Sequence, residues 1–360
     1  MPPKKKTETG SNILSIIENL ESKYPQSTDR AKTPTGCLPV DFVLKGGFKA
    51  PAFIELAGES QTGKTTMALT IAKTLIKKGH RVIYLNFEQA PLQFILHTMG
   101  MDSYDKTQFV VYTPFTIGEG EEILGKLVYC TPIGDEPYFD HVFFDSVGGM
   151  IPDYLDDDDK DSTDNTPAVR ARQLAKFFEV NTAKLKRRGV SCWFVNHLSL
   201  KIETEYGKVS KKKSKGGVAV EYWCDDRLFL ESGETLKAKS HDNATGTKAG
   251  ENEFYANIGR LTHAKARIGG MLRKTDCPVF FGKGVSNSYW LYLVLKNNGY
   301  TSVNGSYIKC TLLDEKGVNL QGVQGICKYL TENSKAVISE MKKQGIWNFL
   351  DDDEEPEGEA

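Results

Sequence analysis

The segment Gly58 to Thr65 constrains this chain more than any other, because it reads Gly-Glu-Ser-Gln-Thr-Gly-Lys-Thr. A glycine, four variable positions and then Gly-Lys-Thr are typical of a loop that wraps nucleotide phosphates. The apolar run Phe53–Leu56 precedes the loop, and the helix-like stretch Thr65–Lys78 follows it. A strand, a tight turn and a helix in that order direct backbone N–H groups and a helix dipole toward an anion. The segment therefore predicts an α/β fold that holds a nucleotide.

The rest of the chain alternates strand-like and helix-like stretches, which predicts an α/β P-loop ATPase core with a mostly parallel twisted sheet over residues 34–285. Short apolar runs typical of strands buried on both faces are Val82–Phe87, Val110–Tyr112, Val142–Phe144 and Cys192–Val195. Helix-like stretches between them are Pro91–Met99, Gly120–Tyr129 and Val169–Arg188.

Three smaller regions flank the predicted core. Residues 1–33 are expected to hold a basic tip and one helix, whose apolar stripe is Ile13, Ile16, Ile17 and Leu20. Residues 286–345 are expected to form a small α+β domain. Residues 346–360 are almost wholly acidic, and we expect this tail to be disordered.

The composition excludes several classes of protein. Hydrophobic residues make up 39% and charged residues 26% of the chain, an ordinary balance for a soluble globular protein. No run approaches 18 apolar residues and no secretory signal opens the chain, so we expect neither a membrane span nor export. Seven scattered cysteines without a Cys-x-x-Cys pair favour a reducing cytoplasm. The net charge of −1 combines separate acidic and basic runs, so nucleic acid is not excluded as a partner.

The phosphate loop assigns ATP contacts to consecutive residues, and we expect Mg²⁺ to accompany the nucleotide. Lys64 would neutralise the β- and γ-phosphates, and the Thr65 hydroxyl would ligate Mg²⁺. Asp145 ends an apolar run and would be the second magnesium partner, although an Asp at that position could also cap the following turn. The expected ATP-binding residues are Gly58, Glu59, Ser60, Gln61, Thr62, Gly63, Lys64, Thr65, Thr66 and Asp145.

Hydrolysis also needs a group that polarises the attacking water. Glu88 ends the strand Val82–Phe87, which we expect to lie beside the strand of the phosphate loop. Taken alone, Glu88 fits an acid at a helix N-terminus better than a catalytic group. Asn196-His197 ends another strand and could detect the γ-phosphate.

Two polar segments without a period follow predicted strands, at the edge where α/β proteins place ligands. They are about 153–167 and 198–217, and both indicate mobile loops, with solvated surface insertions as the alternative. The second offers lysines for phosphates and an aromatic ring for stacking on a base: Lys201, Tyr206, Lys208, Lys211, Lys212, Lys213 and Lys215. The run Asp156–Asp159 makes the first segment strongly acidic, an unfavourable lining for DNA.

Together these motifs resemble the RecA-type recombinases. The order is phosphate loop, Glu88, Asp145-Ser146, Asn196-His197 and a long segment closed by Gly216-Gly217. The phage UvsX branch is most similar, because it also has Asn-His where bacterial RecA has Asn-Gln. Three further stretches resemble family patterns: Thr35-Gly36 with Asp41, Ala264-Lys265-Ala266-Arg267, and Asn298 to Leu330.

The resemblance implies a DNA-dependent ATPase that forms a helical filament on single-stranded DNA and pairs it with homologous duplex in recombination, repair and replication. It makes Glu88 the catalytic carboxylate, with Lys64 and His197 as catalytic partners. Lys265 and Arg267 would reach the ATP of the adjacent subunit. The N-terminal helix would pack on that subunit, with packing on its own domain as the alternative. The implied DNA-binding residues outside the lysine-rich segment are Arg170, Arg172, Gly216 and Gly217. Ile95 replaces the aromatic residue that stacks on adenine in the family, with Phe94 next to it.

Other implied partners are a single-strand-binding protein and a loader; a phage protein would work in the host cytoplasm. Two alternatives use the same residues. A DnaB-type hexameric helicase shares the phosphate loop and the glutamate, but the chain lacks room for a helical N-terminal domain of the usual size. A non-catalytic mediator would bind ATP and DNA without strand exchange, which the combination of Lys64, Thr65, Glu88 and Asp145 argues against.

Overall fold

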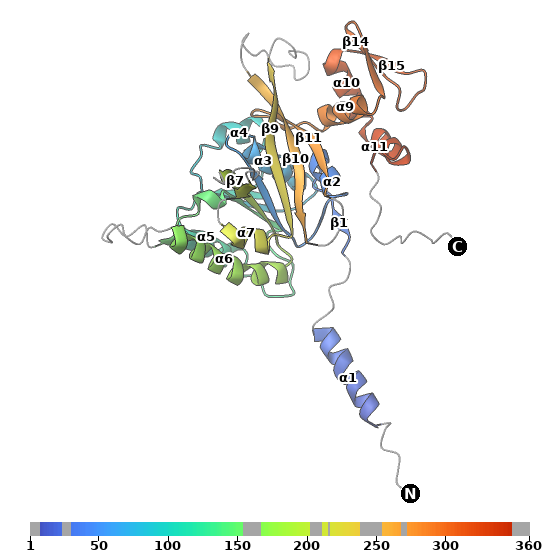
Figure 1. Cartoon of the computed structure of the whole chain (residues 1–360). Helices are drawn as coiled ribbons and strands as arrows, with labels where there is room; N and C mark the ends of the chain where they lie inside the picture. Colours follow the sequence, from blue (N-terminus) through green and yellow to red (C-terminus); the bar gives the residue numbers. More distant parts are fainter. Residues whose placement is uncertain are drawn as a thin grey trace, which may run out of the picture. The chain divides into compact units, whose positions relative to one another are not determined.

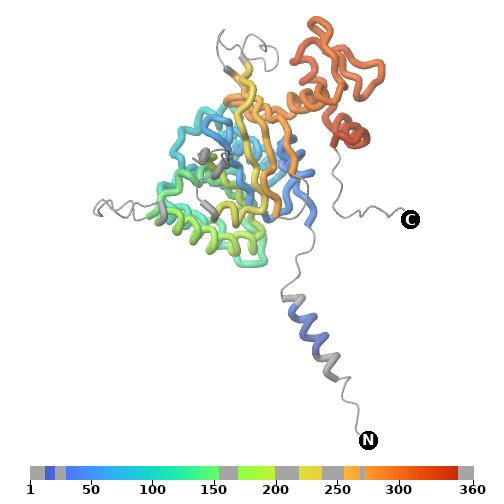
Figure 2. Tube along the Cα trace, in the orientation of Figure 1, coloured from blue at the N-terminus to red at the C-terminus, as the bar shows by residue number. Residues whose placement is uncertain are grey.

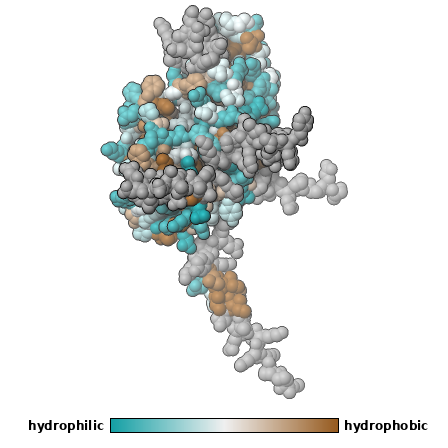
Figure 3. Space-filling model, turned by 60° about the vertical axis from the view of Figure 1, so that its left-hand side comes forward, coloured by the Kyte–Doolittle hydropathy of each residue, from teal (hydrophilic) through white to brown (hydrophobic). Residues whose placement is uncertain are grey.

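The computed structural model describes residues 8–23, 30–153, 167–201, 211–214, 217–237, 254–267 and 272–347. The chain forms two compact units, Met1–Lys32 and Thr33–Ala360. In the first, helix α1 (Glu8–Lys23) exposes the predicted apolar stripe, and Figure 3 shows it as a brown patch. No helix in the described part of the chain is long and apolar enough to cross a bilayer.

One large sheet organises the second unit (Figure 1), and among the described residues it has ten strands. Their order is β12-β11-β10-β9-β3-β7-β6-β4-β5, with β8 paired to β7. The strands are β3 (Phe53–Gly58), β4 (Val82–Asn86), β5 (Phe109–Tyr112), β6 (His141–Asp145), β7 (Ser191–Lys201), β8 (Lys211–Ser214), β9 (Asp226–Lys237), β10 (Phe254–Ala266), β11 (Lys274–Phe280) and β12 (Gly284–Val285). A separate pair joins β1 (Lys32–Thr33) to β2 (Phe48–Lys49).

Strands β9, β3, β7, β6, β4 and β5 run parallel, which confirms the predicted fold class. Strands β9 to β12 are antiparallel to one another and widen the sheet on the other side. Figure 2 shows these yellow and orange strands beside the blue start of the unit. The expectation that the strand before Glu88 lies beside the phosphate-loop strand is wrong, because β7 and β6 lie between β4 and β3.

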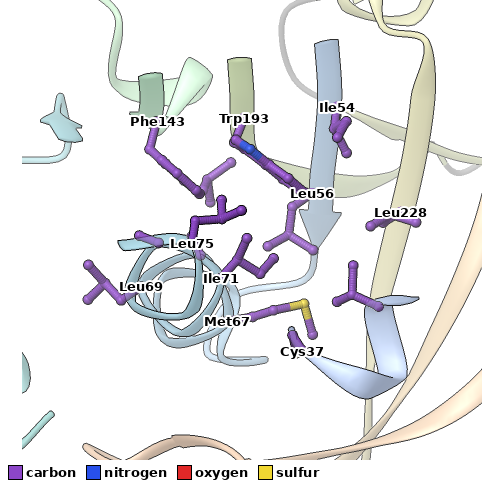
Figure 4. Close-up of a cluster of buried hydrophobic side chains, with 14 of the residues drawn as sticks. Cys37, Ile54, Leu56, Met67, Leu69, Ile71, Leu75, Phe143, Trp193 and Leu228 are labelled. Atoms are coloured by element: carbon purple, nitrogen blue, oxygen red, sulfur yellow. The ribbon is translucent and has the colours of Figure 1, made fainter. Parts of the chain in front are cut away.

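Helices cover both faces of the sheet, and the alternation of side chains along each strand decides which face each residue meets. Ile54 and Leu56 of β3 pack in the cluster that contains α3, whereas Phe53 packs in the cluster of α5, α6 and α7. Trp193 and Phe143 stack in a row under α3 (Figure 4), with ring centroids 5.6 Å apart. The helices are α2 (Leu38–Val43), α3 (Lys64–Lys77), α4 (Gln93–Thr98), α5 (Ile117–Leu127), the 3-10 turn η1 (Val147–Gly149), α6 (Pro167–Arg187) and α7 (Gly217–Trp223).

The segment 198–217 is more regular than its composition indicates. Leu198 to Lys201 continue β7 beyond the core and pair antiparallel with β8. The described residues of this segment therefore do not form an irregular loop. They form the paired ends of the hairpin of β7 and β8, which α7 follows. Positions 154–166 and 202–210 lie outside the described residues, and so does the tail beyond Trp347.

The last part of the described chain contains both helices and strands. Its elements are α9 (Asn287–Asn297), β13 (Thr301–Asn304), β14 (Tyr307–Cys310), β15 (Val318–Gln321), α10 (Gly322–Glu332) and α11 (Ser334–Lys343). Phe42 of α2 packs against Trp290 and Trp347, so this part shares apolar contacts with the start of the unit. The proposed boundary between residues 285 and 286 stays a prediction.

Candidate nucleotide site

The predicted phosphate loop connects the end of β3 to the first turn of α3. Gly63 has φ +93°, and an added Cβ there would lie 2.6 Å from Val279 Cγ1. At Gly58 an added Cβ would lie 2.4 Å from the Leu230 carbonyl oxygen, so both positions require glycine. Lys64 is buried and its Nζ donates to the Glu59 carbonyl oxygen at 2.5 Å. Burial lowers the pKa of this ammonium, which the nearby carboxylates of Glu88 and Asp145 counteract.

Asp145 meets the loop from β6, two strands away from β3. The Thr65 hydroxyl donates to Asp145 Oδ2 at 2.8 Å, and the Tyr84 hydroxyl donates to the same oxygen at 2.6 Å. Asp145 is 2% exposed, and this burial raises the pKa of its carboxyl above the ordinary value. Its other oxygen, Oδ1, is buried and has no hydrogen-bond partner within the described residues.

These donors fit a magnesium ion that arrives with a nucleotide. Hydroxyl and carboxylate oxygens are the ligands Mg²⁺ prefers, and it commonly binds through one or two of them together with substrate phosphates. A buried carboxylate oxygen without a partner is rare in folded proteins and calls for a missing ligand. Among the described residues no group of three or more His, Cys, Asp or Glu side chains could hold a metal by itself, so the phosphates would complete the coordination.

Glu88 lies two residues beyond the end of β4, and its side chain contacts the same site. Its backbone N–H donates to the Asp145 carbonyl oxygen at 3.1 Å. Glu88 Oε1 accepts from the Ser146 hydroxyl and lies 2.6 Å from His197 Nε2. The hydrogen bond with His197 lowers the pKa of Glu88 to about 2. Three predicted residues, Glu88, Asp145 and His197, therefore converge, because β4, β6 and β7 lie side by side in the sheet.

Residues predicted to act on a neighbouring subunit lie elsewhere. Lys265 Nζ donates to the carbonyl oxygens of Glu221 and Cys224, and Arg267 pairs with Asp225 at 2.9 Å. Both therefore contact the C-terminal end of α7 instead of the phosphate loop of their own chain.

The predicted DNA-binding residues are described only in part. Arg170 donates to the carbonyl oxygens of Val147 and Gly148 in η1, whereas Arg172 is exposed. Tyr206, Lys208, Lys215 and Gly216 lie outside the described residues. Lys201, Lys211, Lys212, Lys213 and Gly217 are described through their backbone in β7, β8 and α7.

Sequence reasoning missed four polar residues that support this site. Tyr84 lies within a run that was interpreted only as an apolar strand. Its side chain points to the face of the sheet that α3 covers. Ser146 was noted only as a neighbour of Asp145. Glu55 and Arg227 form a buried ion pair at 2.5 Å, and Glu55 was hidden inside an apolar run. A charge in the middle of an apolar strand is the signal that could have identified Glu55.

Comparison with known proteins identifies the family of the chain. Residues 15–286 match the model of the RecA N-terminal domain. The chain is 28% identical over 318 residues to Protein RecA of Nostoc sp. (strain PCC 7120), covering 88% of this chain and 80% of that protein. It is 26% identical over 301 residues to Protein RecA of Gloeothece citriformis, covering 83% and 76%. The crystal structure of the RadB recombinase aligns with a TM-score of 0.46 at 17% identity, over 70% of this chain and 97% of that one.

Proposed function

The chain belongs to the RecA family, and we propose that it is an ATP-dependent recombinase. It would polymerise on single-stranded DNA as a helical filament and exchange that strand with a homologous duplex, in recombination, repair and recombination-dependent replication. The observation that carries the proposal is the convergence of two pairs, Thr65 with Asp145 and Glu88 with His197, beside one phosphate loop. Asn196-His197 supports placing the chain with the phage UvsX branch.

The chemistry we propose is hydrolysis of ATP. The phosphate loop and Lys64 bind the phosphates, and Thr65 with Asp145 would hold Mg²⁺, which neutralises charge on the β- and γ-phosphates when bound. Glu88 is ionised at neutral pH and can accept a hydrogen bond from the attacking water. A carboxylate with a pKa of about 2 is a weak base, so in this arrangement it orients the water more than it removes a proton.

His197 supplies the connection between the nucleotide and the DNA. Its Nε2 atom carries one proton at most, so an imidazole that donates to a γ-phosphate cannot at the same time donate to Glu88. Transfer of that hydrogen bond would raise the pKa of Glu88 toward its ordinary range and make it a better base. The same movement would act on β7, which continues into the hairpin of β7 and β8. ATP would thereby act as a switch for the segment 198–217.

The two loops and the remaining predicted residues have defined roles in this proposal. Lysines of the segment 198–217 neutralise DNA phosphates and Tyr206 stacks on a base, so binding is insensitive to sequence and weakened by salt. Lys265 and Arg267 exchange their contacts at the end of α7 for the ATP of the adjacent subunit, which α1 helps to hold. A single-strand-binding protein and a loader would act as partners.

The test is ATP hydrolysis with and without single-stranded DNA, run beside strand pairing with homologous and heterologous duplexes. We expect stimulated hydrolysis and pairing that requires homology, and Lys64→Ala as the control should lose both. Stimulated hydrolysis with unwinding of a forked duplex and no pairing would instead indicate a helicase. Binding of ATP and DNA with neither hydrolysis nor pairing would indicate a mediator.

A further inference from the structure

A buried charge pair lies directly behind the phosphate loop. Glu55 of β3 and Arg227 of β9 are partners in the parallel register, and Glu55 is fully buried. Arg227 Nε donates to Glu55 Oε2 at 2.5 Å, and Asn196 Nδ2 donates to Glu55 Oε1 at 2.8 Å. Both carboxylate oxygens are therefore engaged. We call Glu55, Arg227 and Asn196 the Glu55 cluster.

Stability alone does not account for this cluster. Removing two charges from water is costly, and their attraction in the interior often only compensates for that loss. Apolar side chains of similar volume would fill the same space between β3 and α7 without the cost. The neighbours of Glu55 along β3, Phe53, Ile54 and Leu56, are all apolar. The charges therefore call for a role in holding particular elements in place.

The Glu55 cluster contacts both stems of the segment 198–216. Asn196 lies where β7 leaves the core, and its Oδ1 accepts from the backbone N–H of His197 at 2.8 Å. At the other stem, Arg227 pairs with Glu221 of α7 at 3.3 Å, and α7 begins at Gly217. Glu55 itself lies three residues before Gly58, the first residue of the phosphate loop. One carboxylate thus connects the phosphate-loop strand to the two ends of a single surface segment.

We propose that Glu55 is a positioning residue that couples the nucleotide site to the stems of segment 198–216. It acts by fixing Asn196, and through it His197, and by fixing Arg227 against α7. This inference rests on the proposed function, because the coupling matters only if the segment binds a ligand such as single-stranded DNA. Glu55 touches no reacting atom, so its loss should change the response to DNA and leave nucleotide binding intact.

The substitution Glu55→Gln tests the charge without changing the volume. A glutamine has one oxygen and one NH₂ group, so it must turn a donor toward either Arg227 or Asn196. The matched control is Glu136→Gln, which makes the same change in the exposed pair with Arg81. A second variant, Glu55→Leu with Arg227→Met, removes both buried charges, and the partner that Arg227 leaves, Glu221, is exposed to water. It therefore leaves no unpaired charge in the interior, which guards against simple unfolding.

Two measurements apply to each variant. The first is kcat and KM for ATP with and without single-stranded DNA. We expect both variants of the Glu55 cluster to keep the KM for ATP within about twofold of the parent value. Their kcat in the presence of single-stranded DNA should be about tenfold lower than that of the parent. The second is backbone hydrogen exchange, which should rise at 196–201 and 217–223 while 82–86 and 141–145 stay protected. Glu136→Gln should match the parent in both.

Clear outcomes overturn the inference. If the double variant folds and DNA stimulates its hydrolysis as in the parent, Glu55 does not couple the sites. Unchanged exchange at both stems in Glu55→Gln would contradict it as well. A parent chain without DNA-stimulated hydrolysis would reject the proposed function, and the exchange measurement would still decide the positioning role. If neither variant folds, Asn196→Ala, which removes the hydrogen bond from β7 to Glu55 and leaves the pair of Glu55 with Arg227, is measured in the same way.

Discussion

Two buried polar clusters lie at the two faces of the same sheet, and they differ in how completely their polar atoms are hydrogen-bonded. On the side of α3, Asp145 keeps one buried oxygen without a partner in the described residues, and burial raises its pKa. On the side of α7, both oxygens of Glu55 accept hydrogen bonds. An unsatisfied cluster is prepared for a ligand, whereas a satisfied one holds the protein itself together. By this comparison, Asp145 belongs to a binding site, whereas the Glu55 cluster holds the strands and α7 in place around it.

The largest expected effect comes from a substitution in the cluster that is prepared for a ligand. Glu88→Gln should lower kcat for ATP by about 10²- to 10⁴-fold, because the amide cannot polarise the attacking water. Binding of nucleotide and of single-stranded DNA should stay near the parent value. Single-turnover hydrolysis together with DNA anisotropy measures both, with Glu122→Gln on the exposed surface as control. Retained hydrolysis would mean that another carboxylate does the work.

The next largest effect concerns the apolar layer that surrounds the ligand cluster under α3. Trp193 is 1% exposed and stacks on Phe143. Trp193→Ala should lower the free energy of unfolding by about 3–5 kcal/mol, because it leaves a cavity that the stiff row of rings cannot fill. Tyr222→Ala, at a side chain 62% exposed, should change it by about 0.5 kcal/mol or less. Urea denaturation measures both, and equal losses would show that the layer does not stabilise the sheet.

A third substitution separates ligand binding from stability at the unsatisfied atom. Asp145→Asn keeps the shape but removes the charge that Mg²⁺ requires. We expect the Mg²⁺ concentration for half-maximal hydrolysis to rise about 10- to 100-fold. The melting temperature without Mg²⁺ should be equal or higher, since burial disfavours the ionised carboxylate. A lower melting temperature with an unchanged Mg²⁺ requirement would make Asp145 a structural residue.

The smallest effect tests whether a buried polar atom without a hydrogen-bond partner always marks a ligand site. Such atoms also occur away from the nucleotide site. Neither ring nitrogen of buried His141 has a hydrogen-bond partner in the described part of the chain. Burial lowers its pKa from 6.5 to about 3, so the folded protein keeps this imidazole neutral while the unfolded chain takes up a proton. The resulting contribution to stability is present above pH 6.5 and is lost as the pH falls toward 3.

His141→Phe should therefore flatten the decline of unfolding free energy below pH 6.5, by at most about 1.4 kcal/mol per pH unit. The ring of Phe48 already packs edge-on against this position, so a phenylalanine can be accommodated. Chemical denaturation at several pH values measures the slope. The same comparison above pH 6.5 is the control, because the imidazole of His141 is neutral there in both the folded and the unfolded chain, and the two slopes should agree. A slope that survives in His141→Phe would assign the acid sensitivity to other groups.

Much of the local structure was predictable from the chain, and the errors have physical causes. The strands and helices around the phosphate loop lie where their apolar periods place them, within a few residues. The neighbour of β3 was predicted wrongly, because strand order depends on contacts between residues far apart in sequence. The hairpin of β7 and β8 was missed because its lysines and serines hide the strand period. Glu55 was missed because three apolar neighbours dominate its segment.

The sequence alone determined the phosphate loop, since backbone groups that bind phosphates must be contiguous and glycine must stand where a side chain would collide. It also determined the fold class, which follows from the alternation of apolar runs and helices. Only the tertiary structure decided which side chains meet. Thr65 and Asp145 are 80 positions apart and Glu55 and Arg227 are 172 apart, yet each pair is in contact. Such pairs form because the order and register of the strands place residues from distant parts of the chain side by side, and local composition does not encode that order.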